Sequence, residues 1–446
     1  MLYLFQIKKL MNNFRNFIIK KFNNNIFLLK RIGINGFIKI KFYVILNFFL
    51  SIPFYVILFF FSLILRILSS FIKVRFQRLL SERIGHYATQ VEIYLCEKKL
   101  SINQPKFKNI DIFFNLGIVC NKYLYKLIKK KIRIYPEFFI NKLLQLDKFF
   151  NFFFKKINSS EVNLYDKDLL NLFQRCKIQL MIPDFDQKKG IKILDKMGIE
   201  KEKKFVCIAA RGDSYLRTKH PNVNWDYHDY RNSSIYNFID AVRYLNSKGY
   251  YVIRIGKNTT EKIKDHNLML FDYADSNFQD DFMDIFLPFK CSFVISTGFG
   301  LDQLPYIYRK KILYVNWSSF NEIYSFSPNI ITIFKHYYSE ETKKKLSIKE
   351  IFEQNLEGIV DSKIFKEKKI SLLENSSLEI KELVQEFIES HEKTFLTNEK
   401  DIWSQKKFWE IYKYYMIKNN FTKFHLNFDN ARIGYNFLRK NEYLLN

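Results

Sequence analysis

The stretch that decides the fold begins Phe205-Val-Cys-Ile-Ala-Ala210, passes through Tyr250-Tyr-Val-Ile-Arg-Ile-Gly256, and ends Val294-Ile-Ser-Thr-Gly-Phe-Gly300. Each piece is an apolar run of strand length that ends in glycine or polar residues. Helical periodicity separates the first two pieces. Buried parallel strands read as near-continuous apolar runs, and strands that alternate with helices indicate βαβ units. The pattern therefore predicts an α/β fold with a parallel sheet. Ligands bind outside the carboxyl ends of such strands, so the residues after each run are the first candidates for a binding site.

The chain has 446 residues and a formal net charge of +27. Nucleic acid, an anionic membrane surface and anionic small substrates are three partners that could explain such a charge. We expect no nucleic acid, because there is no arginine-rich helix, zinc finger or aromatic RNA-binding motif. The five cysteines are scattered without a Cys-x-x-Cys pair, which favours a reducing compartment and argues against a structural zinc site or a disulfide framework.

Residues 42–65 contain no charged side chain and are long enough for membrane insertion, although a buried core helix is the alternative. Basic residues flank the segment on both sides, and Pro53 interrupts it. A re-entrant hairpin or an interfacial helix keeps both basic flanks on an anionic leaflet, whereas a single span separates them. We expect attachment to the anionic cytoplasmic face of the inner membrane and favour the hairpin or interfacial helix over the span.

We predict four regions along the chain. Residues 1–77 form a basic, membrane-anchoring region, and residues 78–189 form a Rossmann-like domain that opens with a strand near residue 79, a helix and a strand at 109–114. Residues 190–375 form a second Rossmann-like domain with strands at 205–210, 250–255, 268–271, 292–296 and 312–315. The chain is expected to be increasingly helical after Asn316. Residues 376–446 form a helical tail that packs back on the domains, with helices at 403–417 and 431–438.

Two polar clusters follow the predicted strands of the second domain. Arg211 and Asp213 come just after the first strand, where a guanidinium can hold a diphosphate through two parallel hydrogen bonds, although a structural ion pair is the alternative. Tyr227-His-Asp-Tyr-Arg-Asn232 precedes a helix, and helix N-termini favour anions. In this cluster His228 is a candidate base oriented by Asp229. A purely structural histidine is the alternative.

A third cluster, Ser296-Thr297-Gly298-Phe-Gly300, lies between a strand and a helix, where glycines let backbone N–H groups approach a phosphate. Asp281 and Asp284 begin the preceding helix, where they serve equally well as helix caps. No Asp-x-Asp, His/Cys metal set, Walker loop or Gly-x-Ser-x-Gly elbow appears, so we expect chemistry without a metal or a cofactor.

The chain resembles, over about residues 80–446, a bacterial family of predicted glycosyltransferases found among surface-polysaccharide genes. The matching pieces are Arg83-Ile-Gly-His86, Arg211 to Leu216, Tyr227 to Ser233, Gly249 to Gly256, Asp281-Phe-Met-Asp284, Ser296 to Leu301 and Phe408-Trp409. The Tyr-His-Asp-Tyr-Arg-Asn string is the specific part. More distantly, the chain is similar to fucosyltransferases of the GT-B class, in which an arginine after a strand binds the donor diphosphate. Those enzymes often carry His-x-Arg there, whereas this chain has Ala209 in that position and Gly212 in place of an acidic residue.

The resemblance implies two Rossmann-like domains of GT-B type and a metal-independent hexosyl- or deoxyhexosyltransferase. Its donor would be a nucleotide-diphosphate sugar, bound by the second domain, and its acceptor a lipid-linked or surface glycan, bound by the first. The implied catalytic residues are His228, Asp229 and Asp213, and the implied acceptor-side residues are Gly85 and His86. The implied donor-binding residues are Arg211, Tyr230, Arg231, Asn232, Arg254, Gly256, Asp281, Ser296, Thr297, Gly298 and Gly300.

Two other functions remain open at this point. One is a non-catalytic, membrane-bound nucleotide-sugar sensor or assembly scaffold of the same fold, which fold alone cannot separate from an enzyme. The other is a membrane-tethered nucleic-acid binder, whose phosphate contacts would give a steep salt dependence.

Overall fold

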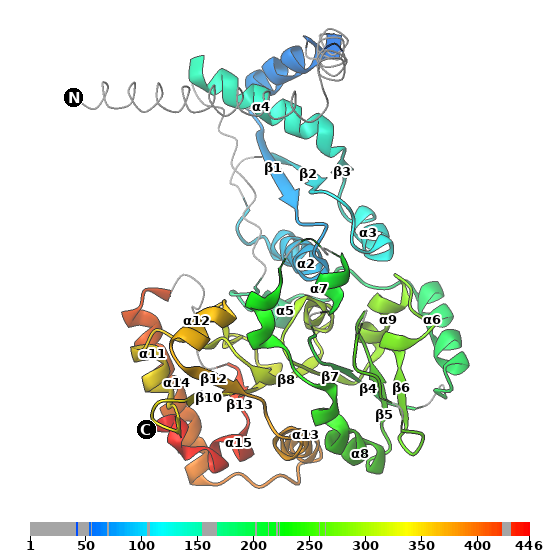
Figure 1. Cartoon of the computed structure of the whole chain (residues 1–446). Helices are drawn as coiled ribbons and strands as arrows, with labels where there is room; N and C mark the ends of the chain where they lie inside the picture. Colours follow the sequence, from blue (N-terminus) through cyan, green and yellow to red (C-terminus); the bar gives the residue numbers. More distant parts are fainter. Residues whose placement is uncertain are drawn as a thin grey trace, which may run out of the picture. The chain divides into compact units, whose positions relative to one another are not determined.

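The computed structural model describes residues 42, 53–54, 56–68, 71–104, 108–153, 167–200, 203–212, 214–219, 222, 224–257, 259–263, 265–421 and 430–446. The chain divides into two compact units (Figure 1). The first contains residues 1–74 and 138–159, and the second contains residues 75–137 and 160–446. Asp213 and most of residues 1–52 lie outside the described residues, so the expectations placed on them stay predictions.

Within the first unit, residues 56–68 are helical, and a second helix, α4, spans Glu137–Phe153. Phe54 stacks on Phe138 with ring centroids 5.5 Å apart, and Phe61 meets Phe139 edge-on at 5.9 Å. Among the described residues, no helix combines the length and the apolar character that a membrane crossing requires. Of the expected insertion segment, residues 43–52 and 55 lie outside the described part of the chain.

A three-stranded sheet contains β1 (Lys73–Leu79), β2 (Asn109–Asn115) and β3 (Ile134–Tyr135), in that order. The helices α2 (Ile84–Leu100) and α3 (Lys122–Lys129) connect these strands. Arg75 on β1 donates two hydrogen bonds to the carboxylate of Asp111 on β2, at 2.5 and 2.7 Å. The strand, helix and strand expected over residues 79–114 are present, but β1 begins earlier, so the expected boundary at 77/78 falls inside a strand.

The main sheet has seven strands in the order β13-β9-β8-β7-β4-β5-β6, and all of its pairings are parallel. The central strands are buried apolar runs, as the sequence pattern predicted. The strands are β4 (Phe205–Ala209), β5 (Tyr251–Arg254), β6 (Leu270–Asp272), β7 (Phe293–Ser296), β8 (Lys311–Trp317), β9 (Ile330–Phe334) and β13 (Arg432–Ile433).

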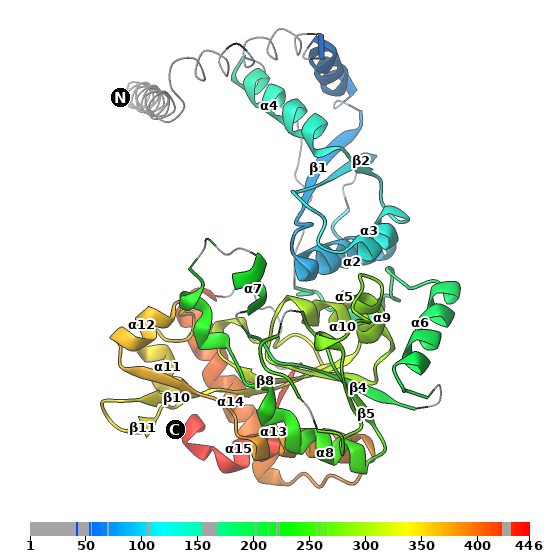
Figure 2. The ribbon, with the colours of Figure 1, turned by 45° about the vertical axis from the view of Figure 1, so that its right-hand side comes forward.

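Helices cover both faces of this sheet (Figures 1 and 2). On one face lie α8 (Ile239–Ser247) and α13 (Ser377–His391), which contact each other. On the other lie α9 (Met283–Lys290) and α10 (Gln303–Ile307), and α2 packs on α10. Shorter elements are α5 (Leu172–Arg175), α6 (Asp184–Lys196), α7 (Ser214–Lys219), η1 (Asp226–Arg231), η2 (Ile235–Phe238), η3 (Tyr273–Asp275), η4 (Gly300–Asp302) and η5 (Phe320–Glu322).

The expected boundary at 189/190 also falls inside an element, because α6 runs from Asp184 to Lys196. Gly190 is helical, and a Cβ atom there would lie 2.4 Å from the ring of Phe286 on α9. The glycine therefore permits close packing of two helices, where the sequence suggested a turn between domains.

The expectation of increasing helix after Asn316 was wrong for the first part of that segment. Four more strands follow: β9 joins the main sheet, and β10 (His336–Ser339) pairs antiparallel with β11 (Lys344–Lys345) and β12 (Ile370–Leu373). A short, mostly apolar run such as residues 330–334 fits a buried strand or a buried helix equally well. It forms a strand here because it pairs with the edge of β8.

The last part of the chain completes the main sheet. Besides α11 (Ile348–Glu353) and α12 (Ser362–Glu367), it contains the expected long helix as α14 (Glu399–Lys418). The segment expected as one helix at 431–438 is instead β13 followed by α15 (Tyr435–Lys440) and η7 (Glu442–Leu445). Because β13 pairs with β9 at the sheet edge, this part belongs to the same core.

Candidate active site

The order of the strands marks where a ligand belongs. From β4 the chain proceeds outward through β5 and β6, then returns to the other side of β4 and proceeds outward again through β7, β8 and β9. The sequence of strands thus reverses between β4 and β7. In open α/β sheets, ligands bind outside the carboxyl ends of the strands at such a switch point.

Arg211 and Thr297 occupy this switch point. Arg211 follows the end of β4 by two residues, and Thr297 follows β7 directly. The Arg211 backbone N–H donates to Thr297 Oγ1 at 2.9 Å, and the Thr297 N–H donates to the carbonyl of Ala209 at 3.3 Å. Both side chains are buried. These contacts join two of the loops that the sequence singled out as phosphate-binding.

The Arg211 guanidinium fixes the turn of residues 226–232. Its Nη1 donates to the His228 carbonyl at 3.1 Å and to Asn232 Oδ1 at 3.3 Å. Asn232 Nδ2 in turn donates to Asp229 Oδ1 at 3.0 Å. Arg217 lies 3.8 Å from the same carboxylate oxygen. Asp229 is therefore engaged by Asn232 and Arg217, and the expected orientation of His228 by Asp229 has no counterpart in these contacts.

A second arginine of this turn contacts the loop of residues 297–300, which we call the glycine loop. Arg231 Nη2 donates to the Gly298 carbonyl at 2.6 Å. Gly298 has a φ of +82°, and a Cβ atom there would lie 2.5 Å from the Trp317 ring. A side chain at this position would have to adopt the left-handed region and displace a buried tryptophan. Gly298 is thus required by the shape of the loop, and Arg231 lies on that loop's backbone.

Asp302 holds the glycine loop closed. Its Oδ1 accepts from Ser296 Oγ at 2.6 Å, and its Oδ2 accepts from the Phe299 N–H at 2.7 Å. Burial raises the pKa of this carboxyl to about 7, although both hydrogen bonds and the charge of Arg231 oppose the rise. Ser296 is fully buried, and its hydroxyl therefore stabilises the loop through Asp302.

The charges of both arginines act on His228. Burial, together with the charges of Arg211 and Arg231, lowers its pKa to about 4, and the charge of Asp361 opposes this shift. Its Nδ1 is buried and has no hydrogen-bond partner among the described residues. The imidazole is neutral at pH 7, and its ring packs on Tyr227 with centroids 4.0 Å apart. Tyr230, next in the turn, faces inward and packs on Phe365 of α12 at 5.7 Å.

Lys335 completes the basic cluster, and the sequence interpretation did not include it. It follows β9 directly and is 4% exposed. Its Nζ donates to the Asn232 carbonyl at 2.5 Å. The signal was available, because Lys335 ends an apolar run in the way that Arg211 follows one. It was missed because residues 330–334 were not recognised as a strand.

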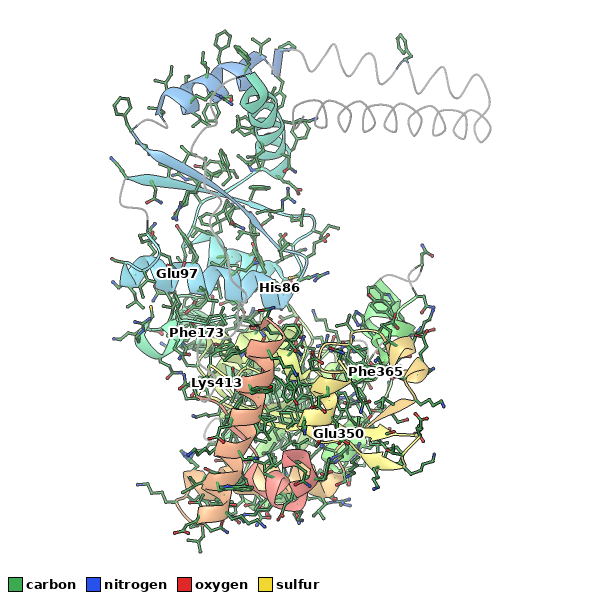
Figure 3. All side chains as sticks on the ribbon, turned by 90° about the vertical axis from the view of Figure 1, so that its left-hand side faces the viewer. His86, Glu97, Phe173, Glu350, Phe365 and Lys413 are labelled. Carbon is green, nitrogen blue, oxygen red and sulfur yellow. The ribbon has the colours of Figure 1, made fainter. Side chains whose placement is uncertain are left out.

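The start of α2 meets the glycine loop from another direction. A Cβ atom on Gly85 would lie 2.5 Å from the Gly300 carbonyl oxygen and 2.9 Å from Gln303 Cγ. His86 follows at the N-terminal end of α2 and is partly exposed (Figure 3). The expected acceptor-side pair therefore lies beside Gly300, within the same compact unit as Arg211.

Two expected donor-binding residues, Arg254 and Asp281, have protein partners of their own. Arg254 is 3% exposed and pairs with Asp272 at 3.0 Å, which is its neighbour on the adjacent strand. Gly256 follows it at the end of β5. Asp281 Oδ2 accepts from the Lys122 N–H at 2.7 Å, at the start of α3. Arg254 and Asp281 thus make structural contacts with protein groups outside the cluster around Arg211. The expected role of Asp213 lies outside the described residues.

The site therefore consists of Arg211, Arg231 and Lys335 around the turn of residues 226–232, with Thr297 and Gly298 beside it. Planar guanidinium groups, buried hydroxyls and a glycine loop at the carboxyl ends of parallel strands suit a phosphate-bearing ligand. Among the described residues, no three His, Cys, Asp or Glu side chains are grouped as metal ligands. The expectation that no metal takes part stays a prediction.

No protein-family model and no curated protein matches the chain. Solved structures similar to it include the ADP-heptose lipopolysaccharide heptosyltransferase II of E. coli, at 11% identity and a TM-score of 0.31, over 58% of this chain and 90% of that one. A glycosyl transferase family 9 protein of Veillonella parvula has 8% identity and a TM-score of 0.37, over 66% and 96%. The MnaA protein of S. aureus, solved with UDP, has 10% identity and a TM-score of 0.30, over 72% and 98%. At these values the similarities assign no function.

Proposed function

We propose that the protein is a glycosyltransferase that transfers a hexosyl or deoxyhexosyl group from a nucleotide-diphosphate sugar to a lipid-linked or surface glycan. The observation that carries the proposal is the bond between Arg211 and Thr297 at the topological switch point, with Arg231 and Lys335 close by. A diphosphate has the charge and the oxygen geometry that this arrangement requires.

In this reaction the sugar's anomeric carbon leaves the donor diphosphate and forms a bond to an acceptor hydroxyl oxygen, whose proton passes to a base. Arg211 would stabilise the charge that develops on the departing diphosphate, since such preorganised cations act where charge forms. Arg231 would hold the glycine loop in place through the Gly298 carbonyl. Tyr230 and Asn232 were expected to bind the donor. In this proposal they support the turn of residues 226–232 instead.

The candidate bases are His228, Asp229, His86 and Asp213. His228 is neutral at pH 7, as a base must be, but a pKa of about 4 makes it a weak one while no anion offsets the two arginines. A bound diphosphate would raise that pKa. His86 follows Gly85, the residue that lies against Gly300, on the first turn of α2. The order in which we test them is His228, then Asp229, then His86 and Asp213.

We also propose that the protein works at an anionic membrane surface, on its cytoplasmic side. No acidic residue precedes Glu82, whereas thirteen lysines and arginines do. On the helix of residues 56–68, one face carries large apolar side chains that are more than half exposed, namely Ile57, Phe60, Ile64 and Ile67. Apolar side chains with a basic surrounding sequence favour the interface of an anionic bilayer.

Vesicle sedimentation tests the membrane proposal on the full chain. Replacing Ile57, Phe60, Ile64 and Ile67 together by serine should strongly reduce sedimentation with anionic vesicles, and neutral vesicles should bind the unchanged chain weakly. Equal sedimentation of the changed and unchanged chains would remove this helix from the account. Deletion experiments should begin the chain at residue 71, because β1 starts at Lys73.

A thermal-shift screen tests the donor. Ligands that bind the native state raise the unfolding temperature by mass action. We expect one class of nucleotide sugars, and its nucleoside diphosphate, to stabilise the protein, and radiolabelled sugar from that donor to reach a glycan acceptor. A non-catalytic sensor or scaffold is the alternative, favoured by the engagement of Asp229 with Asn232 and Arg217. Such a protein would bind the nucleotide sugar and neither transfer nor hydrolyse it.

A further inference from the structure

Within the described part of the chain, Lys335 is a buried cation without a carboxylate partner. It is 4% exposed, and among the described residues its ammonium forms no ion pair. The ammonium donates to the Asn232 carbonyl at 2.5 Å, and the backbone N–H of Lys335 donates to the Trp317 carbonyl at 3.0 Å. Lys335 therefore connects the ends of β8 and β9 with the turn that Arg211 also holds.

The charged groups that act on Lys335 are Arg211 and Glu374. Glu374 accepts hydrogen bonds from the Ser234 N–H at 3.1 Å and from Asn237 Nδ2 at 2.9 Å, so its carboxylate is already engaged by the start of the next helix. Arg211 repels the ammonium. A charge buried under such conditions is costly unless an opposite charge joins it.

Arg211 and Lys335 bind opposite sides of one residue. Arg211 donates to the side-chain oxygen of Asn232, and Lys335 donates to its carbonyl oxygen. Two mutually repelling cations are thus held on one turn, at the edge of the sheet where a ligand is expected. An anion placed there offsets both charges at once.

We propose that Lys335 is a positioning residue of the candidate active site, which fixes the turn of residues 226–232 and whose positive charge is balanced by the phosphate groups of a bound nucleotide. This inference rests on the proposed function, since it takes the nucleotide as the anion. It adds that binding is coupled to the uptake of one proton.

The direction of the pKa agrees with this. Burial lowers the pKa of Lys335 to about 8, Arg211 lowers it as well, and Glu374 opposes them. Two neighbouring groups of the turn do not titrate in this range, because the pKa of His228 is lowered to about 4 and burial raises that of Tyr230 above its ordinary value of 10.0. Proton uptake between about pH 7.5 and 9.5 would therefore report Lys335.

Titration calorimetry with ADP and UDP on the full chain tests the inference, in buffers of different ionisation enthalpy from pH 7.5 to 9.5. Both nucleotides keep their phosphates ionised over this range. The nucleotide that binds should take up close to one proton per site above pH 8. Its affinity should fall by up to about tenfold per pH unit there, as linkage requires.

Two substitutions and a control separate charge from folding. Lys335→Arg stays charged, so its affinity should no longer depend on pH over this range and no proton should be taken up. Lys335→Met should bind more weakly at every pH, also without proton uptake. Lys311→Met is the matched control, because Lys311 also donates to a backbone carbonyl, that of Pro328 at 2.9 Å, but at the amino end of β8. It should behave like the unchanged chain.

If the nucleotide affinity of the unchanged chain does not depend on pH, the inference is overturned. It is also overturned if proton uptake survives in Lys335→Met or is lost in Lys311→Met. Absence of binding by either nucleotide would overturn it together with the proposed function. Proton-coupled nucleotide binding without any sugar transfer would leave the inference standing and remove only the transferase.

Discussion

The backbone of Gly85 lies so close to Gly300 that a Cβ atom on Gly85 would be 2.5 Å from the Gly300 carbonyl oxygen. The reverse is not true, because a Cβ atom on Gly300 would find only the Gly85 nitrogen, at 3.9 Å. The first turn of α2 is thus fitted to the glycine loop of the candidate site. This asymmetry makes the two glycines a matched pair for mutagenesis.

Gly85→Ala should therefore destabilise the protein by about 1–3 kcal/mol, the typical cost of overpacking, because backbone atoms must move apart. Gly300→Ala should leave the unfolding free energy nearly unchanged. Chemical denaturation of both variants measures the difference. Equal stability of the two would mean that α2 does not contact the glycine loop in this way.

Arg254 should prove structural. It is buried and paired with Asp272 across neighbouring strands. Asp272→Asn leaves a buried charge without its partner, which typically costs about 3–5 kcal/mol, whereas nucleotide affinity of the remaining folded protein should stay unchanged. Denaturation and calorimetry on the same preparation check both parts. A specific loss of nucleotide affinity with intact stability would return Arg254 to the donor site.

Asp302 should make stability depend on pH. Its folded-state pKa of about 7 lies above the ordinary 3.8, so the folded protein keeps a proton that the unfolded chain has lost between these values. Stability contributed by this group is then present below about pH 4 and falls as the pH rises to about 7. Asp302→Asn can still accept from the Phe299 N–H and can donate to Ser296 Oγ. The melting temperature of the variant minus that of the unchanged chain should therefore increase as the pH rises from 4 to 7. A difference that stays constant over this range would contradict the prediction.

The turn of residues 226–232 offers a test of catalysis. A positioned general base typically contributes about 10²- to 10⁴-fold in rate. If His228 is the base, His228→Ala should lower turnover by that factor with little change in donor affinity. Asp229→Asn should have a small effect, because Asp229 contacts Asn232 and Arg217. Small, additive losses from both would direct the search to His86.

Much of the main sheet could be predicted from the sequence, because its central strands are continuous apolar runs with polar residues after them. The same logic placed Arg211, Thr297 and Gly298 together. It failed for Lys335, since the run before it is short and reads as either helix or strand until β8 offers an edge for pairing. It did not show the partner of Arg254, because no sequence pattern indicates that Asp272 lies beside it on the next strand.

The predicted boundary at 189/190 falls inside a helix for a related reason. Gly190 looked like a turn residue, whereas it lies in α6 against the ring of Phe286. Local sequence does not distinguish a glycine needed for a turn from one needed for close packing. Such choices are made by residues that lie far away along the chain.

The central claim is that Arg211 binds the diphosphate of a nucleotide, and affinity measured by calorimetry on Arg211→Lys tests it most directly. Lysine keeps the charge but loses the planar fork, so affinity for the nucleoside diphosphate should fall by about 1–3 kcal/mol, the worth of charge-assisted hydrogen bonds. Arg243→Lys is the control, because Arg243 lies exposed on α8 beside Asp240 and should bind as the unchanged chain does. If Arg211→Lys binds every nucleotide as tightly as the unchanged chain, the switch point is not the donor site and the account is wrong.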